Sequence, residues 1–243
     1  MISLVVTCYN RASLVGPCIA SIRAQTSADW ELSVVDDGSA DGSAAAATAA
    51  AQGDPRIKIF ALPHYGVNGT VKDYGVRQAS GPWCACVDSD DTLAPTAVAE
   101  AAAALAADPT AGVLYTDRLL VTRQGGPGRP DPFNRLAWSM AGLLERFITR
   151  PLFVYRKDLY LQTGGYNPAL RFAADYDLAL KLSELSPVLH LARPLYLRTV
   201  SPHTLSQQNR AAQGRCACLA QLAAYQRRGF PIPARLQPYL PTA

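Results

Sequence analysis

Short and almost wholly apolar segments alternate with helical segments along the first half of the chain. Apolar runs cover residues 3–7, 32–35, 57–60, 84–87 and 113–116. A continuous apolar run is typical of a parallel strand covered on both faces. Between the runs, Leu14, Cys18 and Ile22 recur at helical spacing, and alanine tracts at 44–51 and 97–107 favour helix. The pattern predicts an α/β fold with one Rossmann-like, mostly parallel central sheet flanked by helices.

The second half of the chain is less regular. Residues 123–134 hold three glycines and three prolines, which predicts a loop, and a loop of this length inside a compact domain is usually functional. The remaining pattern predicts helices at 158–162 and 175–184, strands at 188–191 and 195–199, and a terminal helix at 206–228. Because neither a repeat nor a linker interrupts the pattern, we expect one domain over residues 1–243, with an irregular tail at 229–243.

The composition is that of a globular protein with a mild positive charge. Of the 243 residues 49% are hydrophobic and 17% charged, and the formal net charge is +4. This charge suits an anionic small substrate or an acidic membrane surface, and it is too weak and scattered for nucleic acid. No run reaches the roughly 18 apolar residues of a membrane span, and the opening residues lack a basic leader. We expect a cytoplasmic protein, and peripheral contact with the inner face of the membrane stays open.

The six cysteines include two Cys-x-Cys pairs. Zinc sites usually show Cys-x₂-Cys spacing, so the pairs favour small apolar filler in a reducing compartment over a zinc site. The cysteines are Cys8, Cys18, Cys84, Cys86, Cys216 and Cys218.

Polar side chains follow the predicted strands where each strand ends. Thr7 to Arg11 follow the first, residues 36–39 the second, residues 88–91 the fourth, and Asp117 the fifth. In α/β sheets, ligands bind beyond the carboxyl ends of the strands. We therefore expect these polar groups to converge on one edge of the sheet.

The densest group is Asp88, Asp90 and Asp91, directly after an apolar run. Crowded carboxylates raise one another's pKa unless a cation relieves the repulsion, and oxygen ligands suit magnesium or manganese. The alternative is a cap for the helix that begins near Pro95, for which Asp91 or Thr92 alone would suffice. The sequence thus favours a Mn²⁺ or Mg²⁺ site that also meets phosphate oxygens.

The order of these motifs resembles family 2 glycosyltransferases of the GT-A fold. The resemblance rests on residues 4–11, on 34–39, and on 87–91 with an Asp-x-Asp motif. It continues through Gly66, residues 72–75 and 79–81, and the stretches 164–167 and 174–178. Residues 153–206 are similar to domains of bacterial glycosaminoglycan polymerases of the chondroitin type.

The resemblance implies a role for individual residues. Asp36 would hydrogen-bond the uracil of the donor, although a turn with a helix cap is the alternative for residues 36–39. Lys72 stands where many relatives have arginine and lacks its bidentate fork. The implied donor-binding residues are Thr7, Tyr9, Arg11, Asp36, Gly66, Lys72, Asp88 and Ser89.

Metal and acid–base roles follow from the same resemblance. Asp90 is the first choice of metal ligand, with Asp88 beside it and His203 as a third ligand or else a surface loop residue. Asp175, in the first turn of a predicted helix, is the candidate general base or that helix's cap. The other histidines, His64 and His190, are interpreted as structural or solvent-facing.

The resemblance implies a metal-dependent, inverting glycosyltransferase of polysaccharide biosynthesis. It would move a sugar from a UDP-sugar donor, bound by residues 1–117, to a glycan or lipid-linked sugar acceptor, bound by residues 118–228. One alternative is a degenerate domain that binds nucleotide-sugar without turnover, which predicts decayed carboxylates. Another is a nucleotidyltransferase, which would carry glycines near the first strand that residues 7–11 lack.

Overall fold

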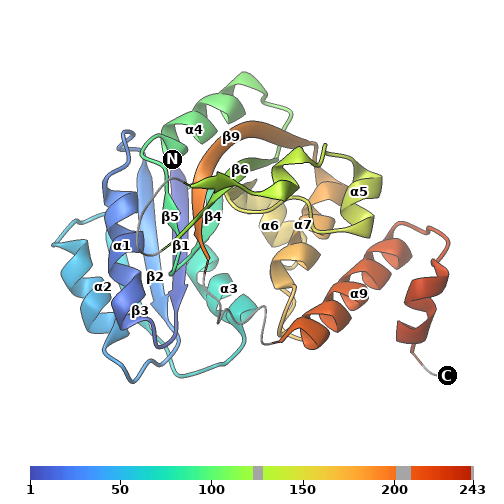
Figure 1. The fold of residues 1–243 in the computed structure, drawn as a ribbon, viewed down its shortest axis with the longest axis horizontal. Helices are drawn as coiled ribbons and strands as arrows, with labels where there is room; N and C mark the ends of the chain where they lie inside the picture. Colours follow the sequence, from blue (N-terminus) through green and yellow to red (C-terminus); the bar gives the residue numbers. More distant parts are fainter. Residues whose placement is uncertain (123–127, 201–208, 242–243) are drawn as a thin grey trace.

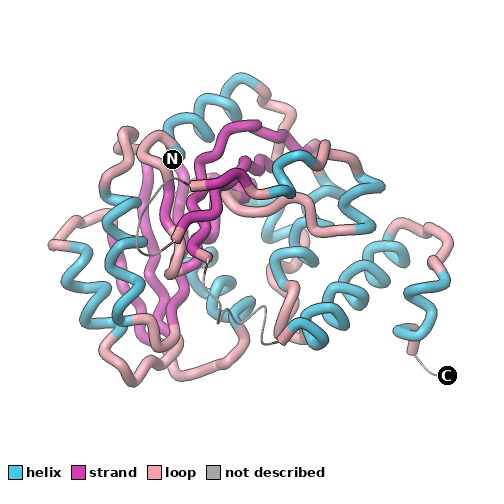
Figure 2. The backbone as a smooth tube through the Cα atoms, in the orientation of Figure 1, coloured by secondary structure: helices cyan, strands magenta, loops and turns pink. Residues whose placement is uncertain are grey.

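A single sheet with helices on both faces forms the body of the molecule (Figures 1 and 2). The computed structural model describes residues 1–122, 128–200 and 209–241. The strands are β1 (Ile2–Cys8), β2 (Trp30–Asp36), β3 (Ile57–Ala61), β4 (Trp83–Asp88), β5 (Thr92–Leu93), β6 (Val113–Val121), β7 (Arg129–Pro130), β8 (Phe153–Arg156) and β9 (Val188–Thr199). Within the described residues they pair in the order β3-β2-β1-β4-β8-β6-β9-β5, and β7 pairs with β6.

Two hydrophobic cores separate the helices into two layers. The helices are α1 (Ala12–Arg23), α2 (Ser43–Ala51), α3 (Asn68–Gln78), α4 (Ala97–Ala107), α5 (Met140–Glu145), α6 (Lys157–Gln162), α7 (Ala174–Leu185) and α9 (Arg210–Arg227). Helices α1, α2 and α4 contribute to one core, and α3, α5, α6, α7 and α9 to the other. Figure 1 shows α9 at the opposite end of the molecule from α2. The predicted α/β sheet is confirmed, and its antiparallel members are β8, β5 and β7.

The continuous apolar run of β1 is explained by burial on both faces. Leu4 and Val6 point into the core that contains α1, and Val5 points into the core that contains α3. Successive strand residues face opposite sides of a sheet, so both sets must be apolar when helices cover both sides.

The parallel register brings the candidate site residues to one edge. β1 lies between β2 and β4, with Cys8 opposite Asp36 and Thr7 opposite Asp88. The carboxyl ends of three strands thus meet at the same level, as the sequence predicts.

The region predicted as two strands at 188–191 and 195–199 is one strand, β9. It runs beside β6, and the pairing shifts register between Thr116 and Asp117, where Asp117 is opposite Pro194. A β-bulge accommodates a proline that would otherwise interrupt a ladder. Asp117 was expected to follow its strand, but β6 continues to Val121, so that expectation is wrong.

Two segments expected to be irregular contain short elements. The described part of the predicted loop forms β7 and a 3₁₀ helix, Pro132–Arg135, in which Asp131 accepts a hydrogen bond from N of Phe133. The tail forms another 3₁₀ helix, Ala234–Tyr239, with Leu236 buried. The sequence pattern did not predict α3, α5, β5 or β8. The predicted start of the terminal helix at 206 lies outside the described residues.

Gly75 on α3 allows this helix to approach the sheet closely. A Cβ at this position would lie 2.4 Å from Cγ1 of Val5 and 3.1 Å from Cγ2 of Val35. We expect Gly75→Ala to lower the free energy of unfolding by about 1–3 kcal/mol through overpacking, measured by urea denaturation. Gly214→Ala in α9 is the matched control, because a Cβ there meets no atom of the described residues within 4 Å. Equal stability of the two variants would contradict the close-packing explanation.

Candidate active site

The carboxylate of Asp36, at the end of β2, is buried and held by its own loop. Ser39 donates to it from its backbone N at 3.1 Å and also from its hydroxyl. The Cys8 thiol lies 3.5 Å from the same carboxylate, and burial, followed by the charge of Asp36, raises the pKa of Cys8 to about 12. The residue before α2 is Gly42, so this loop does not supply the helix cap. The role of Asp36 toward uracil stays a prediction.

An aromatic pair lies next to this loop. Tyr9 is 44% exposed, and its ring stacks on His64, with ring centroids 4.1 Å apart. Nδ1 of His64 lies 3.0 Å from Oδ2 of Asp37. Asp37 also accepts from N of Tyr65 at 2.7 Å and from N of Gly66 at 3.1 Å. His64 is therefore structural, and it helps to fix the orientation of the exposed Tyr9 ring.

Other predicted donor-binding residues surround the same strand ends. Oγ1 of Thr7 donates to Oδ1 of Asn68, at the start of α3, at 2.8 Å. Arg11 directly precedes α1, and its backbone N donates to Oγ of Ser43 at 2.7 Å. Ser89, after β4, is buried.

The acid cluster after β4 divides into one buried and two more accessible carboxylates. Asp91 is buried and accepts from the hydroxyl of Tyr196 at 2.8 Å and from N of Thr199 at 2.7 Å. Burial, and then the charges of Asp88 and Asp90, raise the pKa of Asp91 to about 7. The side chain of Asp88 is 49% exposed. Asp91 thus ties the cluster to β9, while Asp88 stays accessible to a ligand.

The alternative role of this cluster, a helix cap, is wrong. Thr96 is the residue that precedes α4, and this helix has no side-chain cap. Carboxylate oxygens are ligands that suit Mn²⁺ or Mg²⁺, so a metal at this cluster stays a prediction. Among residues 1–122, 128–200 and 209–241, no three acidic, histidine or cysteine side chains form a ready metal site. His203 lies outside these ranges.

A buried lysine links the acid cluster to the candidate base. Nζ of Lys72, on α3, lies 3.0 and 2.9 Å from the two carboxylate oxygens of Asp175 and 3.6 Å from Oδ1 of Asp88. Burial alone would lower the pKa of Lys72, but the charges of Asp175 and Asp88 outweigh it and raise this pKa. Lys72 is therefore a cation. The sequence predicted Lys72 as a donor-binding residue and did not predict its contact with Asp175.

Asp175 lies in the first turn of α7, where the helix dipole favours a negative charge. The helix is preceded by Ala173, whose φ is +58°, and no side chain caps it, so the capping role for Asp175 is wrong. Asp177, two residues further along α7, is buried and paired with Lys181 at 2.7 Å. Its carboxylate therefore does not compete with that of Asp175 as the candidate base.

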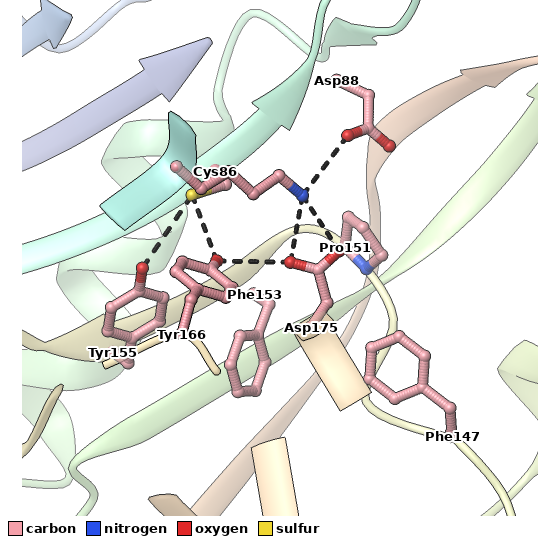
Figure 3. A pocket seen from close by; sticks show the side chains of 9 residues that line it. Cys86, Asp88, Phe147, Pro151, Phe153, Tyr155, Tyr166 and Asp175 are labelled. Carbon is pink, nitrogen blue, oxygen red and sulfur yellow. Dashed lines mark hydrogen bonds and ion pairs between the residues drawn. The ribbon is translucent and has the colours of Figure 1, made fainter. Parts of the chain in front are cut away.

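Aromatic side chains and a thiol complete a small pocket around Asp175 (Figure 3). The hydroxyl of Tyr166 donates to Oδ1 of Asp175 at 3.2 Å and lies 3.3 Å from Sγ of Cys86. In Figure 3, Asp88 and Asp175 approach the same point from opposite sides. The pocket is lined by Lys72, Cys86, Asp88, Phe147, Pro151, Phe153, Tyr155, Tyr166 and Asp175.

Among the described residues, the carboxylate of Asp175 keeps a lone pair for one more hydrogen bond. Lys72 donates to both oxygens and Tyr166 to Oδ1. A carboxylate offers about four lone-pair sites, so Oδ2 retains one. The pocket can therefore orient this carboxylate by two donors and leave one oxygen lone pair for a further donor.

A comparison with known families identifies the domain. The family model described as glycosyl transferase family 2 matches residues 3–163, about two thirds of the chain. The chain belongs to glycosyltransferase family 2. This finding confirms the resemblance drawn from the motifs at the strand ends.

Curated relatives are much longer than this glycosyltransferase domain. The O-antigen biosynthesis protein RfbC of Myxococcus xanthus is 33% identical over 199 residues, which cover 81% of this chain and 16% of RfbC. The chondroitin synthase of Escherichia coli is 27% identical over 200 residues, which cover 82% of this chain and 29% of the synthase. The chain therefore spans less than a third of either relative.

Solved structures confirm the GT-A fold. Staphylococcus aureus TarS 1–349, in complex with UDP, superposes with a TM-score of 0.72 at 21% identity, covering 90% of this chain and 64% of that one. The mannosyltransferase PcManGT from Pyrobaculum calidifontis, in complex with GDP-Man and Mn²⁺, superposes with a TM-score of 0.70 at 18% identity. The match covers 98% of this chain and 67% of that one.

Proposed function

We propose that this domain is a metal-dependent, inverting glycosyltransferase that moves a sugar from a UDP-sugar to an acceptor hydroxyl. The observation that carries the proposal is the pocket in which Asp175 and Asp88 face each other across the buried Lys72. One carboxylate belongs to the acceptor side and the other to the diphosphate side. Transfer would need both functions, a base for the attacking hydroxyl and a cation-binding group for the departing diphosphate.

The donor side would consist of residues 1–117. Tyr9 offers an exposed ring on which a base can pack, and Asp36, Thr7 and Arg11 lie at the neighbouring strand ends. Uridine is the proposed base because of the motif resemblance at Asp36, and the UDP complex of TarS is in keeping with it.

Asp88 and Asp90 would hold Mn²⁺ or Mg²⁺, with His203 as a further ligand. When bound, the cation supplies Lewis-acid stabilisation of the leaving diphosphate. The ammonium of Lys72 contributes a second, fixed positive charge next to Asp88, and this charge needs no reorganisation during the reaction.

Asp175 would remove the proton of the acceptor hydroxyl as the new glycosidic bond forms. Lys72 and Tyr166 fix the orientation of its carboxylate. The aromatic side chains Phe147 and Phe153 line the same pocket.

Residues 118–228 would bind the acceptor, which we propose is a glycan end or a lipid-linked sugar of a bacterial-type polysaccharide. The names of the relatives RfbC and chondroitin synthase are in keeping with this class.

The proposed location is the cytoplasm. The six cysteines are free, which suits a reducing compartment. None of the helices in the described ranges is both long and apolar enough to cross a bilayer, and contact at the inner face of the membrane belongs to the proposal.

A donor screen tests the function directly. The protein is incubated with Mn²⁺ and a panel of UDP-sugars, with GDP-mannose as the matched control, and the released nucleoside diphosphate is measured. We expect UDP release from at least one UDP-sugar and no GDP release from GDP-mannose. Binding of UDP without release from any donor would indicate a degenerate domain, and pyrophosphate release from UTP would indicate a nucleotidyltransferase.

A further inference from the structure

A cluster of arginines lies beside the pocket, with Arg118 on β6, Arg198 on β9 and Arg150 in the segment between α5 and β8. Arg118, on β6, is buried and donates from Nε to Oδ2 of Asp131 at 2.6 Å. Asp131 is buried as well, and its other oxygen accepts from N of Phe133 at 2.9 Å. The carboxylate of Asp131 therefore neutralises the charge of the Arg118 guanidinium.

Arg150 brings a second guanidinium to the cluster. Its Cζ lies 3.8 Å from the ring centroid of Phe133 and 6.0 Å from that of Phe147. Nε of Arg150 is buried and has no hydrogen-bond partner among the described residues. Burial, and then the charge of Arg118, lower the pKa of Arg150 to about 10. A buried charged donor is costly unless it meets an acceptor, which an anionic ligand provides.

Arg198, on β9, adds a third guanidinium. In the register of β6 and β9, Arg118 is opposite Tyr196. Arg198 lies two residues beyond Tyr196 and therefore shares its face of the sheet. The hydroxyl of Tyr196 reaches Asp91, so this face adjoins the acid cluster. The positive charges of Arg118 and Arg198 both act on Arg150, and Asp131 is the carboxylate that opposes them.

The cluster borders the pocket that contains Asp175. Arg150 precedes Pro151 in the chain and lies near Phe147, and both of these residues line the pocket. Figure 3 shows Pro151 and Phe147 on the Asp175 side of the pocket. An acceptor whose hydroxyl meets Asp175 could therefore place a neighbouring substituent at Arg150.

We propose that Arg150, supported by Arg118 and Arg198, forms a subsite for one anionic group of the acceptor, a sugar carboxylate or a phosphate. The inference rests on the proposed function, since it assigns a charge to the acceptor of the same site. Planar guanidinium groups bind both carboxylate and phosphate by paired hydrogen bonds. The stacking of Arg150 on Phe133 orients its guanidinium plane for this contact.

Direct binding of small anions tests the subsite without knowledge of the full acceptor. Inorganic phosphate and D-glucuronate are titrated separately by ligand-observed NMR, with D-glucose as the neutral probe. The protein is used both alone and saturated with UDP and Mg²⁺, which fills the diphosphate site. We expect saturable binding of at least one anion to the nucleotide complex and none of glucose. Tighter phosphate binding indicates a phosphate-bearing acceptor, and tighter glucuronate binding indicates a sugar acid.

Arginine variants decide whether the cluster is responsible. Arg150→Gln should weaken anion binding about tenfold or more, as expected for a lost charge-assisted contact, and Arg150→Lys should recover part of it. Arg193→Gln, at an exposed arginine paired with Glu100, is the matched control and should bind like the wild type. If Arg150→Gln does not fold, Arg198→Gln has the same expected result.

The results separate this inference from the proposed function. Unchanged anion affinity in the folded Arg150 and Arg198 variants, or no saturable binding of either anion, would overturn the subsite. Failure of UDP to bind would count against the proposed function, while the titrations of the protein alone would still report on the arginines. Retained UDP affinity in Arg150→Gln, with weakened anion binding, is the result that assigns the cluster to the acceptor.

Discussion

Asp175→Asn should slow glycosyl transfer by roughly 10²–10⁴-fold, the usual cost of losing a general base. The amide keeps the shape of the side chain and can still accept a hydrogen bond from Lys72, which lies 2.9 Å from Oδ2. It cannot take a proton from the acceptor hydroxyl. UDP affinity should stay near that of the wild type, because Asp88 and the strand-end residues are unchanged. Initial rates at saturating donor and acceptor, together with the Kd of UDP, measure both expectations.

Asp158→Asn is the matched control for this prediction. Asp158 is an exposed carboxylate at the start of α6, paired with Arg156, and its substitution should leave the rate unchanged. Full activity of Asp175→Asn would remove Asp175 from the mechanism. A fall in both UDP affinity and unfolding temperature would assign the effect to the Lys72 network instead.

The edge of the sheet that carries the candidate site was predictable because it depends on local pattern. β1, β2 and β4 are buried on both faces, so their apolar runs stand out. Once these strands are parallel and adjacent, the polar residues after each of them must lie together. The placement of Asp88 beside Thr7 follows from this argument alone.

The partner of the candidate base could not be predicted in the same way. Lys72 and Asp175 are 103 residues apart and meet only because α3 and α7 pack in the same core. Lysine is rarely buried, so nothing in the pattern of α3 marks Lys72 as an interior cation. Only the tertiary structure shows that the Lys72 ammonium contacts the carboxylates of both Asp175 and Asp88.

Contacts with neighbouring strands and loops also differ from what the sequence motifs predict. Pro194 interrupts the apolar pattern of β9, and a bulge in the pairing with β6 keeps the strand continuous. Such pairings are invisible without the neighbouring strand. Asp36 is a second case, since its carboxylate is bound by Ser39 within the same loop, and the motif alone assigns that carboxylate to a ligand.

The acid cluster leads to the second large effect, which concerns metal. Asp90→Ala should abolish the increase in UDP affinity that Mn²⁺ brings, while UDP affinity without metal stays the same. The expected loss exceeds the roughly 10–100-fold cost of removing an outer-shell partner of a metal ligand, because a ligand itself is removed. Titration of UDP with and without Mn²⁺ measures the difference.

Two further variants make this result specific to the ligand oxygen. Asp90→Asn keeps one oxygen donor and should retain part of the Mn²⁺ effect, whereas Asp29→Ala, at an exposed carboxylate paired with the N-terminus, should retain all of it. Manganese-enhanced UDP affinity in Asp90→Ala equal to that of the wild type would refute the metal assignment. Among the described residues, Lys72 would then be the cation that contacts Asp88, and its fixed ammonium would have to stabilise the leaving diphosphate.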